Sequence, residues 1–73
     1  MNMEQLETYA KAQLKNNKPI NLLIAMPGFP EPELITNPPA NIEKKLEYYK
    51  ATYNHDDLTH RHALGIQIIA FAI

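Results

Sequence analysis

Residues 65–73, G-I-Q-I-I-A-F-A-I, form the most apolar stretch of the chain and decide where its hydrophobic core must lie. β-Branched and aromatic side chains at this density favour a strand, which we place at residues 66–73. One face of that strand carries Ile66, Ile68, Ala70 and Ala72, and the other carries Gln67, Ile69, Phe71 and Ile73. Because both faces are apolar, we expect burial on both sides, against the chain's own core or against a partner.

A second apolar stretch, residues 20–26 (I-N-L-L-I-A-M), predicts the other strand of the core. It is bracketed by prolines and is too short for a stable helix. Residues 2–15 predict an amphipathic helix that begins with a capping-box pattern formed by Asn2 and Gln5. The apolar stripe of this helix consists of Met3, Leu6, Ala10 and Leu14.

Residues 27–39, P-G-F-P-E-P-E-L-I-T-N-P-P, hold all but one of the six prolines. Proline removes a backbone donor, so at most one short edge strand, at residues 34–36, is expected here. The rest has two interpretations. It is a rigid connection that packs Phe29 and Leu34 on the core, or it is a recognition loop similar to a polyproline II segment, which loses little entropy on binding.

Residues 38–54 predict a second helix, with Asn37 as its cap and Pro38 at the first helical position. Its apolar stripe consists of Ile42, Leu46, Tyr49 and Tyr53. Asn54 is the expected left-handed residue at its C-terminal end. Tyr48 lies beside the stripe and is a candidate for a binding surface, because aromatic side chains give a large contact area with few rotatable bonds.

These elements predict one α+β domain over residues 1–73, with the order helix, strand, short optional strand, helix, strand. Two helices can cover one face of a two- to three-stranded sheet; the sequence leaves open whether the two main strands pair in parallel or antiparallel. We expect the side of the last strand with Ile66, Ile68, Ala70 and Ala72 to face the helices. Nothing remains to cover the opposite side, with Ile69, Phe71 and Ile73, which predicts self-association as a dimer or docking of a different protein. The candidate partner-binding residues are Phe29, Leu34, Tyr48, Ile69, Phe71 and Ile73.

Composition excludes several classes of function. The formal net charge is -1 and the only arginine is Arg61, so the chain lacks the basic stripe of a nucleic-acid-binding protein. No stretch is long and apolar enough for a transmembrane helix, and no signal-peptide pattern is present, so we expect a cytoplasmic protein without a membrane contact. The chain has no cysteine, and no cofactor motif is visible, because its only glycines are Gly28 and Gly65.

The polar segment 55–64, H-D-D-L-T-H-R-H-A-L, contains all three histidines and is the one candidate for chemistry. If it is extended, His60 and His62 point to the same side, where His55 and an aspartate could complete a metal site. The alternative is a solvated loop that leads into the last strand. No carboxylate pair lies in an apolar setting that would tune its pKa, so we expect a protein that is not an enzyme.

Residues 42–58, I-E-K-K-L-E-Y-Y-K-A-T-Y-N-H-D-D-L, and the apolar segment that ends the sequence resemble small uncharacterised proteins of bacteriophages that infect Gram-positive bacteria. The resemblance covers about half of the chain and carries no catalytic motif. It implies a small accessory protein that binds a host or phage protein. Two other functions stay open: a structural subunit that completes a larger assembly by strand addition through residues 65–73, and a small metal-binding protein that uses histidines.

Overall fold

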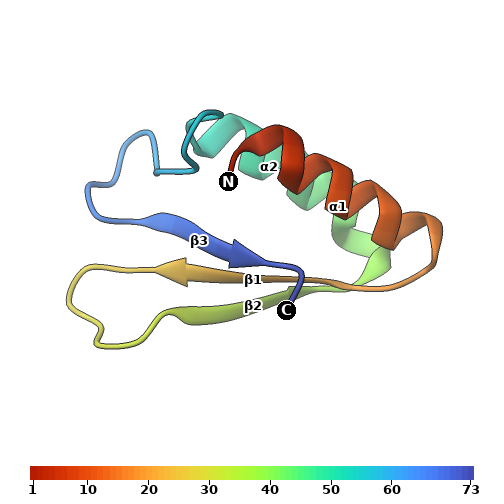
Figure 1. Cartoon of the computed structure of the whole chain (residues 1–73), viewed down its shortest axis with the longest axis horizontal. Coiled ribbons are helices and arrows are strands. Elements are labelled where there is room, and N and C mark those ends of the chain that lie inside the picture. The colour runs from red at the N-terminus through yellow and green to blue at the C-terminus, as the bar shows by residue number, and fades with distance from the viewer.

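Two helices lie against one face of a three-stranded sheet in the computed structural model, which describes residues 1–73 (Figure 1). The elements in order are α1 (Met3–Lys15), β1 (Ile20–Ala25), β2 (Glu33–Asn37), the 3-10 turn η1 (Pro39–Asn41), α2 (Ile42–Thr52) and β3 (Gln67–Phe71). The α+β class, the element order and the short optional strand are therefore confirmed.

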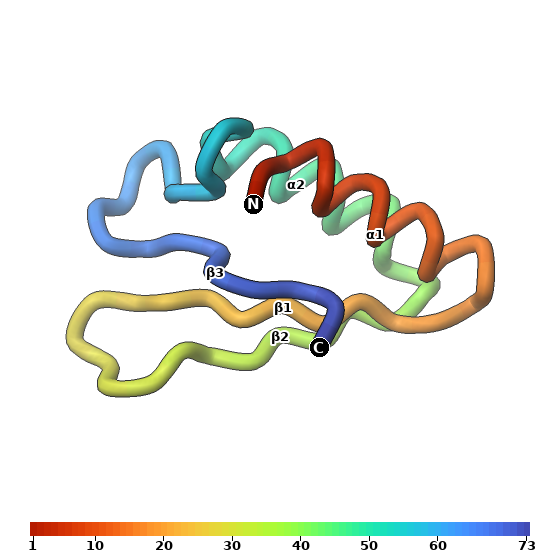
Figure 2. The backbone as a smooth tube through the Cα atoms, in the orientation of Figure 1, coloured from red at the N-terminus to blue at the C-terminus, as the bar shows by residue number.

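The sheet has the strand order β2-β1-β3, and β1 pairs antiparallel with both neighbours. The pairing that the sequence left open is thus antiparallel. Figure 2 shows the tube of β1 between those of β2 and β3, with both helices on the same side of the three strands. β1 takes the central position, which suits its nearly continuous apolar sequence.

Alternate residues of β1 point toward the helices, where Ile20 and Leu22 are fully buried and Ile24 is nearly so. They join α1 and α2 side chains in a core of 12 residues. That core consists of Met3, Leu6, Ala10, Ile20, Leu22, Ile24, Ile42, Leu46, Tyr49, Tyr53, Leu58 and Ile68. Burial of each large apolar side chain contributes about 1.5–3 kcal/mol, so in a chain this short each member matters.

β3 departs from the simple alternation that the sequence suggests. Ile24 pairs with Ile68, but the preceding residue of β1, Leu23, pairs with Ala70, so the register shifts by one residue at Ile69. A bulge of this kind reverses the alternation beyond it. Phe71 therefore faces the helices, stacked on Tyr9 with ring centroids 5.5 Å apart, and Ala70 faces outward. The expected outward position of Phe71 and the inward position of Ala70 are wrong.

Both ends of α1 follow local rules, with a left-handed Asn17 (φ 53°) after its last turn, whereas both ends of α2 differ from the expectation. Asn2 and Gln5 form the predicted capping box at the start of α1. α2 begins at Ile42 rather than at residue 38, because the residues before it form the separate turn η1. Tyr53 already has an extended backbone, yet its side chain stays in the core. The left-handed backbone lies at Leu58 (φ 62°), not at Asn54 as expected.

Candidate functional site

The structure leaves five of the six candidate partner-binding side chains exposed, and it places them on separate surfaces. Their exposed fractions are Phe29 68%, Leu34 59%, Tyr48 49%, Ile69 38% and Ile73 59%. The sixth, Phe71, packs against the core. Phe29 and Leu34 do not pack on the core, so the interpretation of their loop as a tucked connection is wrong.

The first candidate surface is the outer face of the sheet, the face opposite the helices. Leu23 lies at its centre, opposite Leu34 of β2 on one side and Ala70 of β3 on the other. Beside this row, the Thr36 hydroxyl donates to Oδ1 of Asn21 at 2.7 Å, so a polar pair borders it. An apolar strip thus crosses all three strands on the side away from the helices (Figure 1). Leu34 is exposed in it, whereas Leu23 and Ala70 are partly buried.

The second candidate surface is a groove of about 250 Å³ between α2 and the β1–β2 hairpin, which we call the tyrosine groove. Its lining residues are Ile24, Met26, Glu33, Ile35, Lys45, Tyr48, Tyr49, Tyr53, His60 and Ile66. The Lys45 ammonium lies 4.9 Å from the centre of the Tyr48 ring and 5.8 Å from that of Tyr49. It forms no ion pair, since the only ion pairs in the structure involve Glu7. The sequence singled out Tyr48 but gave no sign that the hairpin would form the opposite wall.

A buried hydrogen bond holds the floor of the groove in place. The Tyr49 hydroxyl donates to Oδ1 of Asn37 at 2.6 Å, which joins α2 to the end of β2. Burial raises the pKa of Tyr49 to about 12, and burial also raises the pKa of Tyr53. Both phenols are therefore protonated at neutral pH, and neither can act as a base there.

Side chains and backbone groups of the polar segment 55–64 form hydrogen bonds that cap the C-terminal end of α2. The last carbonyl groups of a helix lack partners within the helix. Here the His55 ring is 2.8 Å from the Lys50 carbonyl, and the Arg61 guanidinium donates through Nε to the Tyr53 carbonyl at 3.2 Å. The Arg61 backbone N–H adds a bond to the Thr52 carbonyl at 2.9 Å. This capping role could not be seen in the sequence, because it depends on the chain folding back onto the helix.

The histidines and aspartates of this segment do not converge. Asp57 accepts from the backbone N–H and hydroxyl of Thr59, and these bonds lower the pKa of its carboxyl group. Nδ1 of His60 accepts from the backbone N–H groups of His62 and Ala63, each at 3.0 Å, so this nitrogen is not free to bind a metal. No group of three histidine, aspartate or glutamate side chains is placed to hold a metal ion. Only Thr59 and His60 form bridges, so the expected extended run is confined to these two residues.

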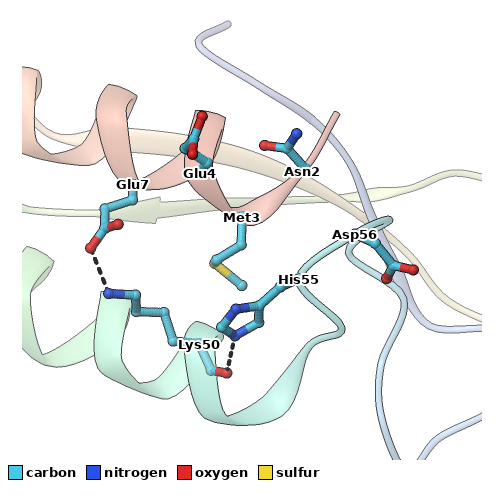
Figure 3. Close-up of a pocket in the computed structure, with 7 residues that line it drawn as sticks. All are labelled: Asn2, Met3, Glu4, Glu7, Lys50, His55 and Asp56. Atoms are coloured by element: carbon cyan, nitrogen blue, oxygen red, sulfur yellow. Dashed lines mark hydrogen bonds and ion pairs between the residues drawn. The ribbon is translucent and has the colours of Figure 1, made fainter.

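A polar hollow of about 450 Å³ lies where the start of α1 meets the end of α2 (Figure 3). Glu7 pairs there with Lys50, and this hydrogen bond lowers the pKa of the Glu7 carboxyl group. Figure 3 shows Glu4 and Asp56 pointing away from that pair. The hollow therefore contains one ion pair between the helices and no pair of carboxylates that could share a substrate or an ion.

Comparison with known proteins finds no matching family model, no matching curated protein and no matching solved structure. None of the helices has the length and apolar character required to cross a membrane. Both candidate surfaces are apolar and lack a partner within the chain.

Proposed function

We propose that this protein is a small, non-enzymatic interaction module that self-associates through the outer face of its sheet and binds another protein in the cytoplasm. The observation that carries the proposal is the apolar strip of Leu34, Leu23 and Ala70, which crosses the sheet on the side away from the helices. The largest apolar patch on the surface of a small protein is often the site of a contact. The phage resemblance of residues 42–58 adds a context in which the second partner is a host or phage protein.

The size of the outer face sets the kind of contact to expect. Strands of this length span about 20 Å, and three strands about 4.8 Å apart span about 14 Å, so the flat face measures roughly 300 Å². Stable protein interfaces bury about 800 Å² on each partner. A dimer held by the outer face alone is therefore weak, and a tighter one must also use surface beyond the sheet.

The arrangement of the polar residues supports a function other than catalysis. His55 and Arg61 are bonded to the end of α2, and the side chains of Asp57 and His60 are bonded to nearby backbone groups. An acid–base catalyst needs a polar group free to meet a substrate. These side chains instead form hydrogen bonds within turns and at the end of α2.

A structural subunit that acts by strand addition is the second candidate. β2 pairs only with β1, so alternate residues of Glu33–Asn37 leave backbone N–H and C=O groups without a strand partner. Addition of a neighbour's strand at this edge is favoured over donation of residues 65–73, because β3 is already paired in its own sheet.

The test of the proposal is the solution mass as a function of concentration, by analytical ultracentrifugation. We expect a reversible monomer–dimer equilibrium that shifts to monomer in Leu34→Lys, which places a charge on the outer face. Leu64→Lys is the matched control, because Leu64 is 97% exposed and lies outside the sheet. A wild-type protein that stays monomeric at millimolar concentration would overturn the proposed self-association. Equal effects of Leu34→Lys and Leu64→Lys would show that the dimer contact is not on the outer face.

A further inference from the structure

The loop that joins β1 to β2 is exposed throughout and carries a prominent aromatic side chain. Residues 27–32 read P-G-F-P-E-P, and all of them are exposed, with Phe29 at 68%. The Phe29 N–H bonds back to the Met26 carbonyl, and Gly28 has the positive φ of 83° that such a turn needs. Three prolines fix φ in the rest of the loop. The loop thus presents Phe29 in a restricted conformation, which reduces the entropy lost on binding.

The tyrosine groove has the size and lining to receive such a segment. Its volume of about 250 Å³ is below the 300–1,000 Å³ that is usual for small-molecule sites, so it suits one or two side chains. Tyr48, Tyr49 and Tyr53 contribute aromatic atoms to it, together with Met26 and Ile66. Grooves lined by aromatic residues are the usual receptors of proline-rich segments, because these segments are already extended before they bind.

The charges of the loop and the groove are complementary. Lys45 lines the groove without an ion pair, and Glu31 is exposed in the loop without one. Glu33 also lines the groove, so an incoming carboxylate is favoured on the side of Lys45 and disfavoured on the side of Glu33. This asymmetry gives a bound loop one preferred direction.

We propose that the tyrosine groove binds the proline-rich loop of a second copy of this chain, with Phe29 inserted beside Tyr48 and Glu31 paired with the partner's Lys45. Met26 and Glu33, which flank the loop, also line the groove, so loop and groove lie at the same end of the molecule. A two-fold axis beside that end places each loop on the other protomer's groove, and the contact forms twice. The inference rests on the proposed self-association and adds a second contact surface, on the helical side of the sheet.

The groove can be tested separately from dimer formation with a synthetic peptide of residues 26–34, MPGFPEPEL. Titrated into the full-length ¹⁵N-labelled protein, it is expected to shift the amide signals of α2 around Lys45 and Tyr48 and that of Ile66. The same peptide with Phe29→Ser is the control and is expected to bind at least about tenfold more weakly, as for loss of an aromatic anchor. Shifts confined to the outer face, or equal binding of both peptides, would overturn the inference.

The full chain supplies the second test, in which the dimer dissociation constant is measured by ultracentrifugation. Phe29→Ser, Lys45→Glu and Glu31→Lys are each expected to weaken the dimer by about tenfold, and the double variant Lys45→Glu/Glu31→Lys is expected to restore it. Lys44→Glu is the control for charge on α2, because Lys44 does not line the groove. All these positions are at least partly exposed, and circular dichroism checks that each variant is folded.

The two proposals fail in different ways. A dimer that is lost in Leu34→Lys but unchanged in Phe29→Ser and Lys45→Glu overturns the groove and leaves the outer face in place. The reverse pattern supports the groove and overturns the outer face. Loss in both sets supports a dimer that uses both surfaces, and a wild-type chain that is monomeric throughout overturns both.

Discussion

The two faces of the sheet differ both in composition and in surroundings, because the outer face mixes leucines and alanines with the polar residues Asn21, Thr36 and Gln67. On the helical face, Ile20 and Leu22 of β1 are completely buried beneath α1 and α2. On the outer face, Leu23 is only partly buried and its neighbour Leu34 is 59% exposed. Apolar residues on both sides of a strand therefore show that both sides can make contacts. They do not show that both contacts come from the same chain.

The sharpest way to test the difference is to shorten adjacent leucines on opposite faces. Leu22→Ala is expected to lower the free energy of unfolding by about 2–5 kcal/mol, because it opens a cavity in the core. Leu23→Ala is expected to cost about 1 kcal/mol or less, because solvent fills the space on the outer face. Urea denaturation of both variants measures the contrast. Equal losses would mean that the outer face is covered in the monomer.

A smaller effect is expected at the one buried polar contact on the helical face. Asn37→Ala removes the acceptor of the Tyr49 hydroxyl and leaves a buried phenol without a partner, at a cost of about 1–3 kcal/mol. Tyr49→Phe combined with Asn37→Ala should then cost less than the sum of the two single changes. Strict additivity in urea denaturation would show that the two side chains do not interact.

The burial of Tyr49 also predicts a pH dependence that the outer face lacks. The pKa of Tyr49 is raised from 10.0 to about 12 by burial, so the unfolded chain loses this proton first. The stabilising effect is complete below pH 10 and is lost as the pH rises from 10 toward 12. The urea midpoint should therefore fall over this range, and the fall should be shallower in Tyr49→Phe. An equal fall of the urea midpoint in the wild type and in Tyr49→Phe would show that other ionisable groups cause it.

The smallest effect on folding is expected on the outer face itself. Leu34→Thr exchanges an exposed side chain for one that also favours strands, so the free energy of unfolding should change by no more than about 0.5 kcal/mol. The same substitution should weaken self-association, which ultracentrifugation measures. A large loss of stability together with an unchanged dimer would reverse the roles that we assign to the two faces.

Much of the fold was predictable because the signals that define it act over a few residues. The capping box of Asn2 and Gln5 places the start of α1. Pro19 and Pro27 confine β1, and Pro32 and Pro38 limit β2 to a short edge strand. Of the candidate site, the exposure of Phe29, Leu34 and Tyr48 agrees with the recognition loop and the side-facing tyrosine that the sequence suggested.

The remaining features depend on residues that are distant in the sequence. The bulge at Ile69 arises where β3 is fitted to β1, and it moves Phe71 from the outer face onto Tyr9. No local pattern in the last strand marks this change. The capping of α2 by His55 and Arg61 has the same origin, since it requires the chain to return to the helix end.

The sequence by itself determined which segments of this protein are helices and strands, because capping residues, prolines and hydrophobic periodicity act locally. It also determined that apolar surface would exceed what two helices can cover. Only the tertiary structure decided which residues form that surface, because strand register sets the direction of every side chain. In the last strand, one extra residue turned Phe71 toward the helices, where it packs against the core, and turned Ala70 to the outer face beside Leu23.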